Sequence, residues 1–492
     1  MAEDRKPAGA GGRQGHGRDL TQGPITKTLL AFALPTLGSN VLQSLNGSIN
    51  SIWVGRFLGE GALAATTNAN LVMFLMFSLC FGFGMAATIL VGQSMGARDL
   101  TAARRAMGTA VGLFGVSSLL IALLGWLFAP ALLHVLATPP DAQALALAYL
   151  RVIFLALPPM FLGVLLTMGM RGMGDSVTPL WLMLLSVALD AGLNPFLIAG
   201  IGPFPRMGIA GAATATLIAN YCVLLVGLAY IYGRDLPIRL RGHEWAYLVP
   251  DRKLLALIFV KGLPIGLQML VFTFSALIMV GLVNRAGVDV TAAYGIAQQL
   301  WTYVQMPAMA IGTAVSAMAA QNIGAKRWDR VGAITWSGVG ANIVITTVMV
   351  GLILAFDRPI FALFVGGDSP AIPIARHIQL IGSWSFIIFG ITVVLFATVR
   401  ANGSVYPPLL ILVLSLLVGR IGFAALLLPR YGTNGLWWSF PIGSAISLTM
   451  ALLYYRFGGW RQAGMLSRLA KEEVRELDQA SGEVGGRLEP SR

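Results

Sequence analysis

The sequence predicts an all-α polytopic membrane protein with twelve transmembrane helices in two parallel six-helix lobes. The 492 residues are 56% hydrophobic and only 11% charged, which is more apolar surface than a soluble chain can hide from water. The apolar residues form continuous runs of about 20 or more, the length that crosses a bilayer core as a helix. The runs do not alternate with polar residues, which excludes a strand barrel. The two halves of the chain also resemble one another.

The twelve predicted spans are joined by short connections. They cover residues 30–56, 63–92, 107–135, 143–170, 178–201, 208–232, 255–284, 291–320, 333–356, 374–400, 406–429 and 434–456. Most of the 34 lysines and arginines lie in the termini and in the connections that follow even-numbered spans. The positive-inside rule places these segments, and with them both termini, in the cytoplasm of a multi-pass inner (plasma) membrane protein. The net charge of +13 therefore indicates topology and not nucleic-acid binding.

An internal repeat relates the two halves. The segment "ATILVGQSMGAR" (87–98) matches "VSAMAAQNIGAK" (315–326), and "RGMGDSVTP" (171–179) matches "RANGSVYPP" (400–408). Because each half has an even number of spans, the repeats are parallel and related by a pseudo-two-fold axis along the membrane normal. Two such lobes around a central cavity suit alternating access, and the alternative is a duplicated bundle that transports nothing.

The repeat and the charge pattern also divide the chain into domains. We expect a disordered cytoplasmic tail, an N-terminal six-helix lobe, a polar cytoplasmic linker, a C-terminal six-helix lobe and a second cytoplasmic tail. Their boundaries are 1–25, 26–232, 233–254, 255–457 and 458–492.

One acidic residue stands apart from the other acids. Of the 21 aspartates and glutamates, Asp190 alone lies at mid-span, in "LDAGLNP" (189–195). A charged aspartate at a helix centre costs about 2.5–3.5 kcal/mol on insertion scales. The side chain is therefore either a neutral group that joins helices by hydrogen bonds or a proton or cation site. Asn194 lies one helical turn later, on the same face.

A stripe of amides in the first span points to a polar pocket in the N-terminal lobe. Gln43, Asn46 and Asn50 recur on one helix face, and such a stripe should face protein or a wet cavity and not lipid. Asn68 in the second span and Asn220 in the sixth are lesser candidates for the same pocket.

The C-terminal lobe carries its own polar and aromatic candidates. Gln268 and Gln298 supply amides, and Trp301 offers a π-face on which a cation could bind. The repeat places Arg420 opposite Ala191. Arg420 is either a structural arginine that bonds to helix ends or a group that faces an anion in the cavity.

The sequence offers no catalytic or metal-binding constellation. The four histidines fall in tails, connections or span ends, and the two cysteines lie inside predicted spans, where packing is their expected role. We therefore expect neither an enzyme, nor a metal, nor a cofactor.

Several motifs resemble one known family of transporters. They are the two repeated turns together with "LPTLGSNVLQSLNGSINSIWVGRFLG" (34–59), "LNPFLIAGIGPFPRMGIAGAATAT" (193–216) and "YGTNGLWWSFPIG" (431–443). They resemble the multidrug and toxic compound extrusion (MATE) family, and most closely its prokaryotic DinF-like branch. The resemblance implies a secondary antiporter that exports organic cations and other amphipathic compounds in exchange for protons or sodium ions.

The family resemblance assigns cation coupling to Asp190, Asn194 and Asn50, with departures from the family pattern. Asn50 aligns with a carboxylate of the family, and the acid and amide of the fifth span are exchanged between Asp190 and Asn194. Phe272 aligns with a glutamate of another branch. A single carboxylate suffices for proton exchange but balances a sodium ion poorly, so proton coupling is favoured.

The expected partners are a small amphipathic substrate, H⁺ or Na⁺ and the lipid bilayer, with the protein a monomer that binds no nucleic acid. The alternative function is a flippase or exporter of a lipid-linked or other amphipathic metabolite. A cavity of that kind should hold several deep basic residues, and Arg420 is the one that the sequence places at depth.

Overall fold

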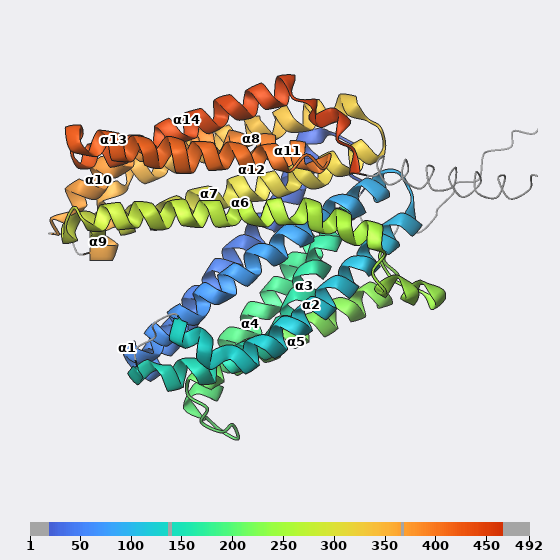
Figure 1. The fold of residues 1–492 in the computed structure, drawn as a ribbon, viewed down its shortest axis with the longest axis horizontal. Coiled ribbons are helices and arrows are strands. Elements are labelled where there is room, and N and C mark those ends of the chain that lie inside the picture. Colours follow the sequence, from blue (N-terminus) through green and yellow to red (C-terminus); the bar gives the residue numbers. More distant parts are fainter. Residues whose placement is uncertain (1–18, 136–139, 366–368, 466–492) are drawn as a thin grey trace, which may run out of the picture.

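The computed structural model describes residues 19–135, 140–365 and 369–465, with the side chains of 60, 61, 63–72, 135, 140–142 and 363–365 left aside. Within these residues the chain is helical and has no strands. Figure 1 shows two helix bundles, one blue to green and one yellow-green to red, which meet at one end and diverge towards the other.

The N-terminal lobe contains six helical spans in five elements. The long α1 supplies two of them, Ile25–Gly59 and Met73–Gly96, because Gly59 leaves helical geometry at φ 79°. The elements are α1 (Ile25–Gly96), α2 (Leu100–Val135), α3 (Pro140–Gly172), α4 (Val177–Ala199) and α5 (Ile209–Gly233).

The C-terminal lobe also contains six spans, and two of them are irregular. The tenth bends by 44° between α10 and α11, and the eleventh, Tyr406–Tyr431, contains the π-helical turn η2. The elements are α6 (Arg252–Asn284), α7 (Val288–Gly324), α8 (Trp328–Ala355), α9 (Asp357–Val365), α10 (Ala371–Gly382), α11 (Ser385–Ala401), α12 (Tyr406–Leu412), η2 (Val413–Arg420), α13 (Ile421–Tyr431) and α14 (Thr433–Phe457).

The predicted spans are all present as helices. Ten helices of the described chain are long and apolar enough to cross a membrane, or eleven when the bent pair α10–α11 counts as one span. The remaining helix, α7, runs over 37 residues and is less apolar because it carries Gln298, Gln299 and Gln305. It completes the twelve helices that the sequence predicts.

The backbone repeats the internal symmetry of the sequence. The turn that follows α1 and the turn that follows α7 each place a basic residue in the left-handed region, with φ of 59° at both Arg98 and Lys326. Gly174 and Gly403 likewise have positive φ in the matching turns after α3 and α11.

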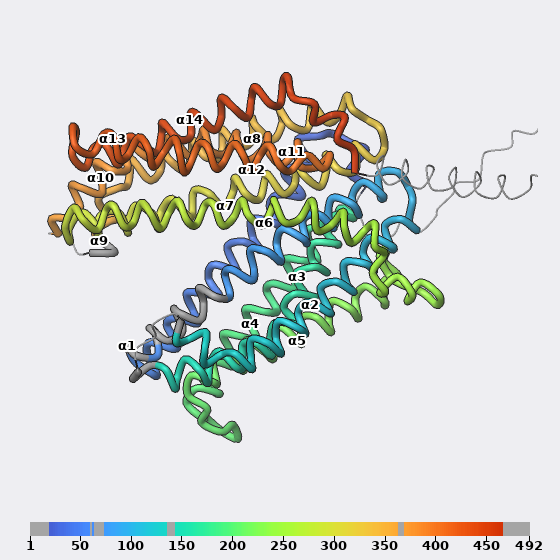
Figure 2. Tube along the Cα trace, viewed as in Figure 1, coloured from blue at the N-terminus to red at the C-terminus, as the bar shows by residue number. Residues whose placement is uncertain are grey.

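The backbones of the two lobes approach one another closely where the ends of α1 and α7 meet. A Cβ atom on Gly96 would lie 1.9 Å from the Gln321 carbonyl oxygen, and one on Gly324 would lie 1.9 Å from the Gln93 carbonyl oxygen. Only glycine permits such an approach between two helix backbones. We call these four residues the axial clasp. The Cα trace in Figure 2 shows the helices converging at this end of the molecule.

Side-chain hydrogen bonds tie the clasp to both lobes. The Gln93 Nε2 donates to the Ala401 carbonyl oxygen at 2.6 Å, and the Gln321 Nε2 donates to the Gly172 carbonyl oxygen at 2.9 Å. Each glutamine thus closes the end of a helix in the opposite lobe, where a carbonyl would otherwise lack a partner.

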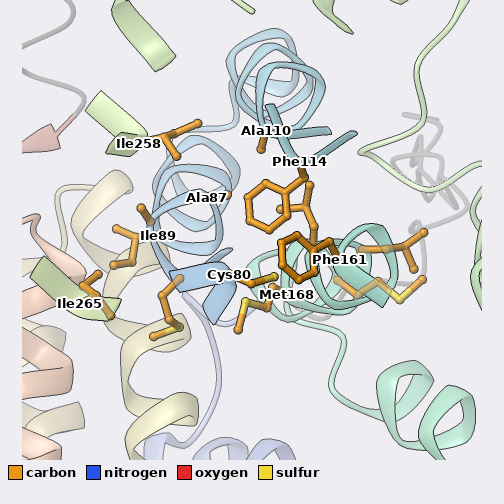
Figure 3. Close-up of a cluster of buried hydrophobic side chains, with 14 of the residues drawn as sticks. Cys80, Ala87, Ile89, Ala110, Phe114, Phe161, Met168, Ile258 and Ile265 are labelled. Carbon is orange, nitrogen blue, oxygen red and sulfur yellow. The ribbon is translucent and has the colours of Figure 1, made fainter. Parts of the chain in front are cut away.

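A hydrophobic core fills the N-terminal lobe and continues across the clasp end into α6. Figure 3 shows Phe114 of α2 beside Phe161 of α3, with Cys80 and Met168 next to them. The two phenylalanine rings meet edge to face at 6.3 Å, a favoured aromatic geometry. Cys80 is buried in this core, in the packing role that the sequence predicts.

The folded region extends beyond the predicted tail boundaries at both ends. Leu20 is buried, its N–H donates to Gln321 Oε1 at 3.0 Å, and Arg327 Nη1 donates to the Thr21 carbonyl oxygen at 2.8 Å. At the other end Trp460 is buried and donates to the Tyr455 carbonyl oxygen at 2.9 Å. Hydrogen bonds and apolar burial therefore hold residues 19–24 and 458–465 against the lobes.

The linker between the lobes packs against α2. It contains the 3₁₀ helix η1 (Gly242–Leu248), and Arg104 of α2 forms an ion pair with Glu244 at 2.8 Å. Burial acts to raise the pKa of Glu244, but the hydrogen bonds from Arg104 and from the Arg241 N–H outweigh it, so the pKa lies below its usual range. The carboxylate is thus held in its charged form.

Candidate functional site

Asp190 is buried in the middle of α4, with 2% of its surface exposed. The Thr216 hydroxyl of α5 donates to Asp190 Oδ1 at 3.0 Å. Asn194 Nδ2 donates to the Asp190 backbone carbonyl at 2.8 Å and lies 3.5 Å from Oδ1. Among the described residues no Lys or Arg forms an ion pair with this carboxylate. Neutral groups therefore surround it.

The amide stripe of α1 reaches the same place. The Asn46 side chain approaches the Asp190 carboxylate. Asn50 approaches the hydroxyl of Tyr149 on α3, and Tyr149 in turn lies close enough to Asp190 to feel its charge. We call Asn46, Asn50, Tyr149, Asp190, Asn194 and Thr216 the N-lobe polar cluster.

The cluster contains unused acceptor atoms. The Oδ1 atoms of Asn46, Asn50 and Asn194 are buried and have no hydrogen-bond partner. Leaving a buried acceptor without a partner costs about 1–3 kcal/mol. Three such atoms near one carboxylate form a cluster that could receive a proton donor, a water molecule or a small cation.

The remaining candidates of the N-terminal lobe lie less centrally. Gln43 is exposed on α1, and Asn220 is half-buried one turn after Thr216 on α5. The structure shows neither of them in contact with Asp190. The side chain of Asn68 lies outside the described residues.

The C-terminal lobe holds a cavity of about 510 Å³, which we call the C-lobe pocket. Gln298, Trp301 and Arg420, three of the residues singled out in the sequence, line it. Its aromatic walls from this lobe are Phe272, Tyr294, Trp301, Phe386, Phe389 and Phe440.

Arg420 stands in the wall of this pocket at the end of the π-helical turn η2. Its guanidinium carbon lies 3.6 Å from the centroid of the Phe440 ring, a close cation–π contact. The Trp301 indole nitrogen donates to Gln379 Oε1 at 2.9 Å and to Ser383 Oγ at 3.3 Å. The wall of the pocket is therefore fixed by hydrogen bonds behind its aromatic surface.

Gln268 lies elsewhere. It is buried, accepts a hydrogen bond from Arg400 Nη1 at 3.1 Å and donates to the Val405 carbonyl oxygen at 3.4 Å. It is not among the residues that line the C-lobe pocket. These contacts join α6 to the turn that precedes α12.

Tyr149 and Thr216 belong to the cluster although the sequence did not single them out. Each is a hydroxyl within a mostly apolar span, and a buried hydroxyl needs a partner. This is a weak signal, because both helices carry other polar side chains as well. Phe272, which replaces an acid of the family pattern, stands in the C-lobe pocket and meets Phe389 edge to face at 5.6 Å.

Comparison with known proteins gives a consistent result over both halves. The family model MatE matches residues 35–196 and 264–426, one match in each lobe. The probable multidrug resistance protein YoeA of Bacillus subtilis is 33% identical over 88% of this chain and 94% of its own length. A second Bacillus subtilis relative, the probable multidrug resistance protein YpnP, is 31% identical over 90% of this chain and 97% of its own length.

A solved structure shares the fold. A MATE crystal structure in complex with MaL6 superposes with a TM-score of 0.83 at 20% sequence identity, over 90% of this chain and 98% of that one. The match of the family model to both halves, together with relatives above 30% identity over nearly the whole length, shows that this chain belongs to the multidrug and toxic compound extrusion (MATE) family of membrane transporters.

Proposed function

We propose that the protein exports amphipathic organic compounds across the plasma membrane by alternating access, in exchange for a cation that binds at Asp190. The observation that carries the proposal is the buried, unpaired carboxylate of the N-lobe polar cluster, in a protein whose two lobes meet at one end and diverge at the other. An intramembrane acid without a basic partner is a functional-site hypothesis by default, because its charge is costly to keep there. The relatives named as multidrug resistance proteins support this class of cargo.

The positive-inside rule supports one orientation of the lobes. Basic residues follow both glycines of the axial clasp. After Gly96 they are Arg98, Arg104 and Arg105, and after Gly324 they are Lys326, Arg327 and Arg330, so they mark the end where the lobes meet. This end is then cytoplasmic, together with both termini. In this proposed orientation the end where the lobes diverge faces the outside. We take the working unit to be the monomer.

A proton is the coupling ion that the cluster serves most simply. The protonated Asp190 is neutral and can donate a hydrogen bond to one of the unpartnered amide oxygens. The ionised form attracts a cationic substrate and water. Substrate and proton then compete for one charge, which is the minimum that an antiporter needs.

Sodium is the second candidate, and the unpartnered oxygens of Asn46, Asn50 and Asn194 favour it. A hard cation such as sodium prefers several oxygen ligands, as calcium and magnesium do. A single carboxylate supplies one negative charge to such a site, so the proton remains our first choice.

A flippase for a lipid-linked precursor finds less support. Its pyrophosphate would need several cationic donors. Among the described residues that line the C-lobe pocket, Arg420 is the one basic side chain.

The test is Asp190→Asn in purified protein reconstituted into liposomes. This change keeps the shape of the side chain and removes its titration. We expect the variant to insert and fold but to lose uphill export of a cationic dye when a pH gradient is imposed. The matched control is Asp175→Asn, because Asp175 caps the start of α4 by accepting from Val177 and Thr178 N–H groups and asparagine caps equally well.

Two outcomes would contradict the proposal or its first choice of ion. If Asp190→Asn still exports the dye uphill at the unmodified rate, the carboxylate does not couple export to a cation. Its role is then to join helices by hydrogen bonds. Export by the unmodified protein is also measured under each gradient alone. If a sodium gradient at equal pH drives export and a pH gradient does not, the coupling ion is sodium and not the proton.

A further inference from the structure

We propose that the C-lobe pocket is a binding subsite for an aromatic carboxylate, with Arg420 as the residue that recognises the carboxylate group. The inference rests on the proposed function in one respect, since it takes the pocket to be part of the path of the substrate. It adds a second substrate class beside the cationic compounds that Asp190 attracts, namely compounds in which a ring system bears one carboxylate.

The charge on Arg420 is not neutralised by the protein. Within the described residues no carboxylate forms an ion pair with it, and its neighbours are the Phe440 ring and the Tyr294 hydroxyl. Its Nε is buried and has no hydrogen-bond partner. A guanidinium carries five N–H donors and no acceptor, so much of its donor capacity is free for an incoming anion.

The backbone holds Arg420 in place. The residue ends a π-helical turn, a local irregularity that is frequent at functional sites. A Cβ atom on Gly443 of α14 would lie 2.9 Å from the Arg420 Cβ, so the two helices touch directly behind the side chain. Phe440 lies one turn before Gly443 and positions the guanidinium from the other side. A cation that is placed before the ligand arrives binds it with little loss of conformational entropy.

The remaining wall of the pocket suits rings. Phe272 and Phe389 meet edge to face, and Trp301 packs against Phe440 with ring centroids 4.7 Å apart. Such surfaces bind flat apolar groups by burial and by aromatic stacking. The volume of about 510 Å³ lies within the range of small-molecule sites.

The single arginine favours a carboxylate over a phosphate. A planar guanidinium matches the two oxygens of a carboxylate in a bidentate pair and balances its one negative charge. A phosphate or pyrophosphate brings more charge, and the described lining of the pocket contains no second cation. The chemistry of the pocket therefore selects a monoanion attached to an aromatic ring.

The experiment compares ligands that share one ring system and differ in one group. Isothermal titration of the purified full-length protein measures the dissociation constants of 2-naphthoate, 2-naphthamide and 2-naphthyl phosphate. We expect 2-naphthoate to bind at least about tenfold more tightly than the neutral amide, as a charge-assisted bidentate pair requires. Arg420→Gln should abolish this ratio, and Arg420→Lys should keep part of it.

Arg430→Gln is the matched control, since Arg430 is exposed at the end of α13 and does not line the pocket. It should leave the ratio unchanged. If Arg420→Gln does not yield folded protein, Phe440→Leu replaces it. That change removes the ring beneath the guanidinium and should reduce the ratio several-fold.

Three results would overturn the inference. The first is an equal affinity of the unmodified protein for 2-naphthoate and 2-naphthamide. The second is a ratio of these two affinities that is unchanged in both Arg420→Gln and Phe440→Leu. The third is that 2-naphthyl phosphate binds more tightly than 2-naphthoate and that this binding depends on Arg420. The titration is made without any ion gradient. Its failure would therefore leave the coupling role of Asp190 intact, while a failure of uphill export would not change the binding ratio.

Discussion

Asp190 and Arg420 are charged residues inside membrane spans, and the protein surrounds them differently. The Asp190 carboxylate is held by neutral hydrogen-bond donors on three helices, with unpartnered amide oxygens nearby. Arg420 lies against an aromatic ring in the wall of a cavity. The first environment suits the proton or cation site that we propose, and the second suits the proposed site for a carboxylate.

Asn50→Leu is the residue-scale prediction. The change removes the amide next to Tyr149 and makes the helix more apolar, so insertion should be unaffected. We expect export in liposomes to fall at least several-fold. Ser51→Leu is the matched control, because Ser51 is exposed one position later and its hydroxyl donates to the Gly47 carbonyl of its own helix. Equal export by the two variants would assign Asn50 to packing.

Periodicity in the sequence predicted part of this cluster. Asn46 and Asn50 were expected on one face of the first span, and Asp190 with Asn194 on one face of the fifth, because helical spacing alone decides which residues of one helix lie together. The contacts with Thr216 and Tyr149 could not be read in this way. They join different helices, and which helix faces which is decided by packing across the whole lobe.

At the scale of helices, the axial clasp brings two helix backbones from different lobes into direct contact. Gly96→Ala places a methyl group where the Gln321 carbonyl oxygen stands. The two helices must then separate, and we expect the clasp end to open more often. Labelling of Ser94→Cys, a buried position next to the clasp, by a maleimide should become several-fold faster in the Gly96→Ala background.

The control for this prediction is Gly115→Ala on α2, where a Cβ would meet nothing within 4 Å. Cys80 and Cys222 are replaced by alanine so that the reporter is the one thiol. Labelling that is equally slow in both glycine variants would show that the helices absorb the methyl group without opening.

The sequence predicted the helices well and their irregularities poorly. Long apolar runs determine where a span begins and ends, so all twelve spans were found. Neither the 44° bend between α10 and α11 nor the π turn at η2 has a proline at its centre from which it could be predicted. Close contacts between helices occur at both places, Gly382 against Trp301 at the bend and Gly443 against Arg420 at the π turn, and such contacts exist only when the helices are packed.

The whole molecule has an orientation that can be tested directly. Ala102→Cys and Trp328→Cys place reporters at the starts of α2 and α8. Both sites lie among lysines and arginines, so we expect them on the cytoplasmic side. We expect an impermeant thiol reagent to label them in inverted vesicles and not in intact cells. Gly202→Cys, in the connection between α4 and α5, should show the opposite pattern. Labelling of Ala102→Cys from outside would reverse the proposed orientation.

The angle between the lobes is the feature of the whole molecule that the sequence could not predict. The repeat predicted two lobes and the axis between them. A protein that works by alternating access must hold at least two arrangements of the same lobes within a few kcal/mol of one another. Composition and periodicity are the same in both, so neither of them can indicate which arrangement is present.

The axial clasp has a consequence for the origin of the chain. Gln93 meets Gly324 and Gln321 meets Gly96, so each half presents the same surface to the other. This is an isologous contact, the kind that joins the two subunits of a symmetric homodimer. Each half carries both members of the contact, so a single six-helix protein could have paired with its own copy before duplication and fusion joined the two genes. Once fused, the two halves could diverge inside the membrane spans. The N-terminal half now carries Asp190 there, and the C-terminal half carries Arg420.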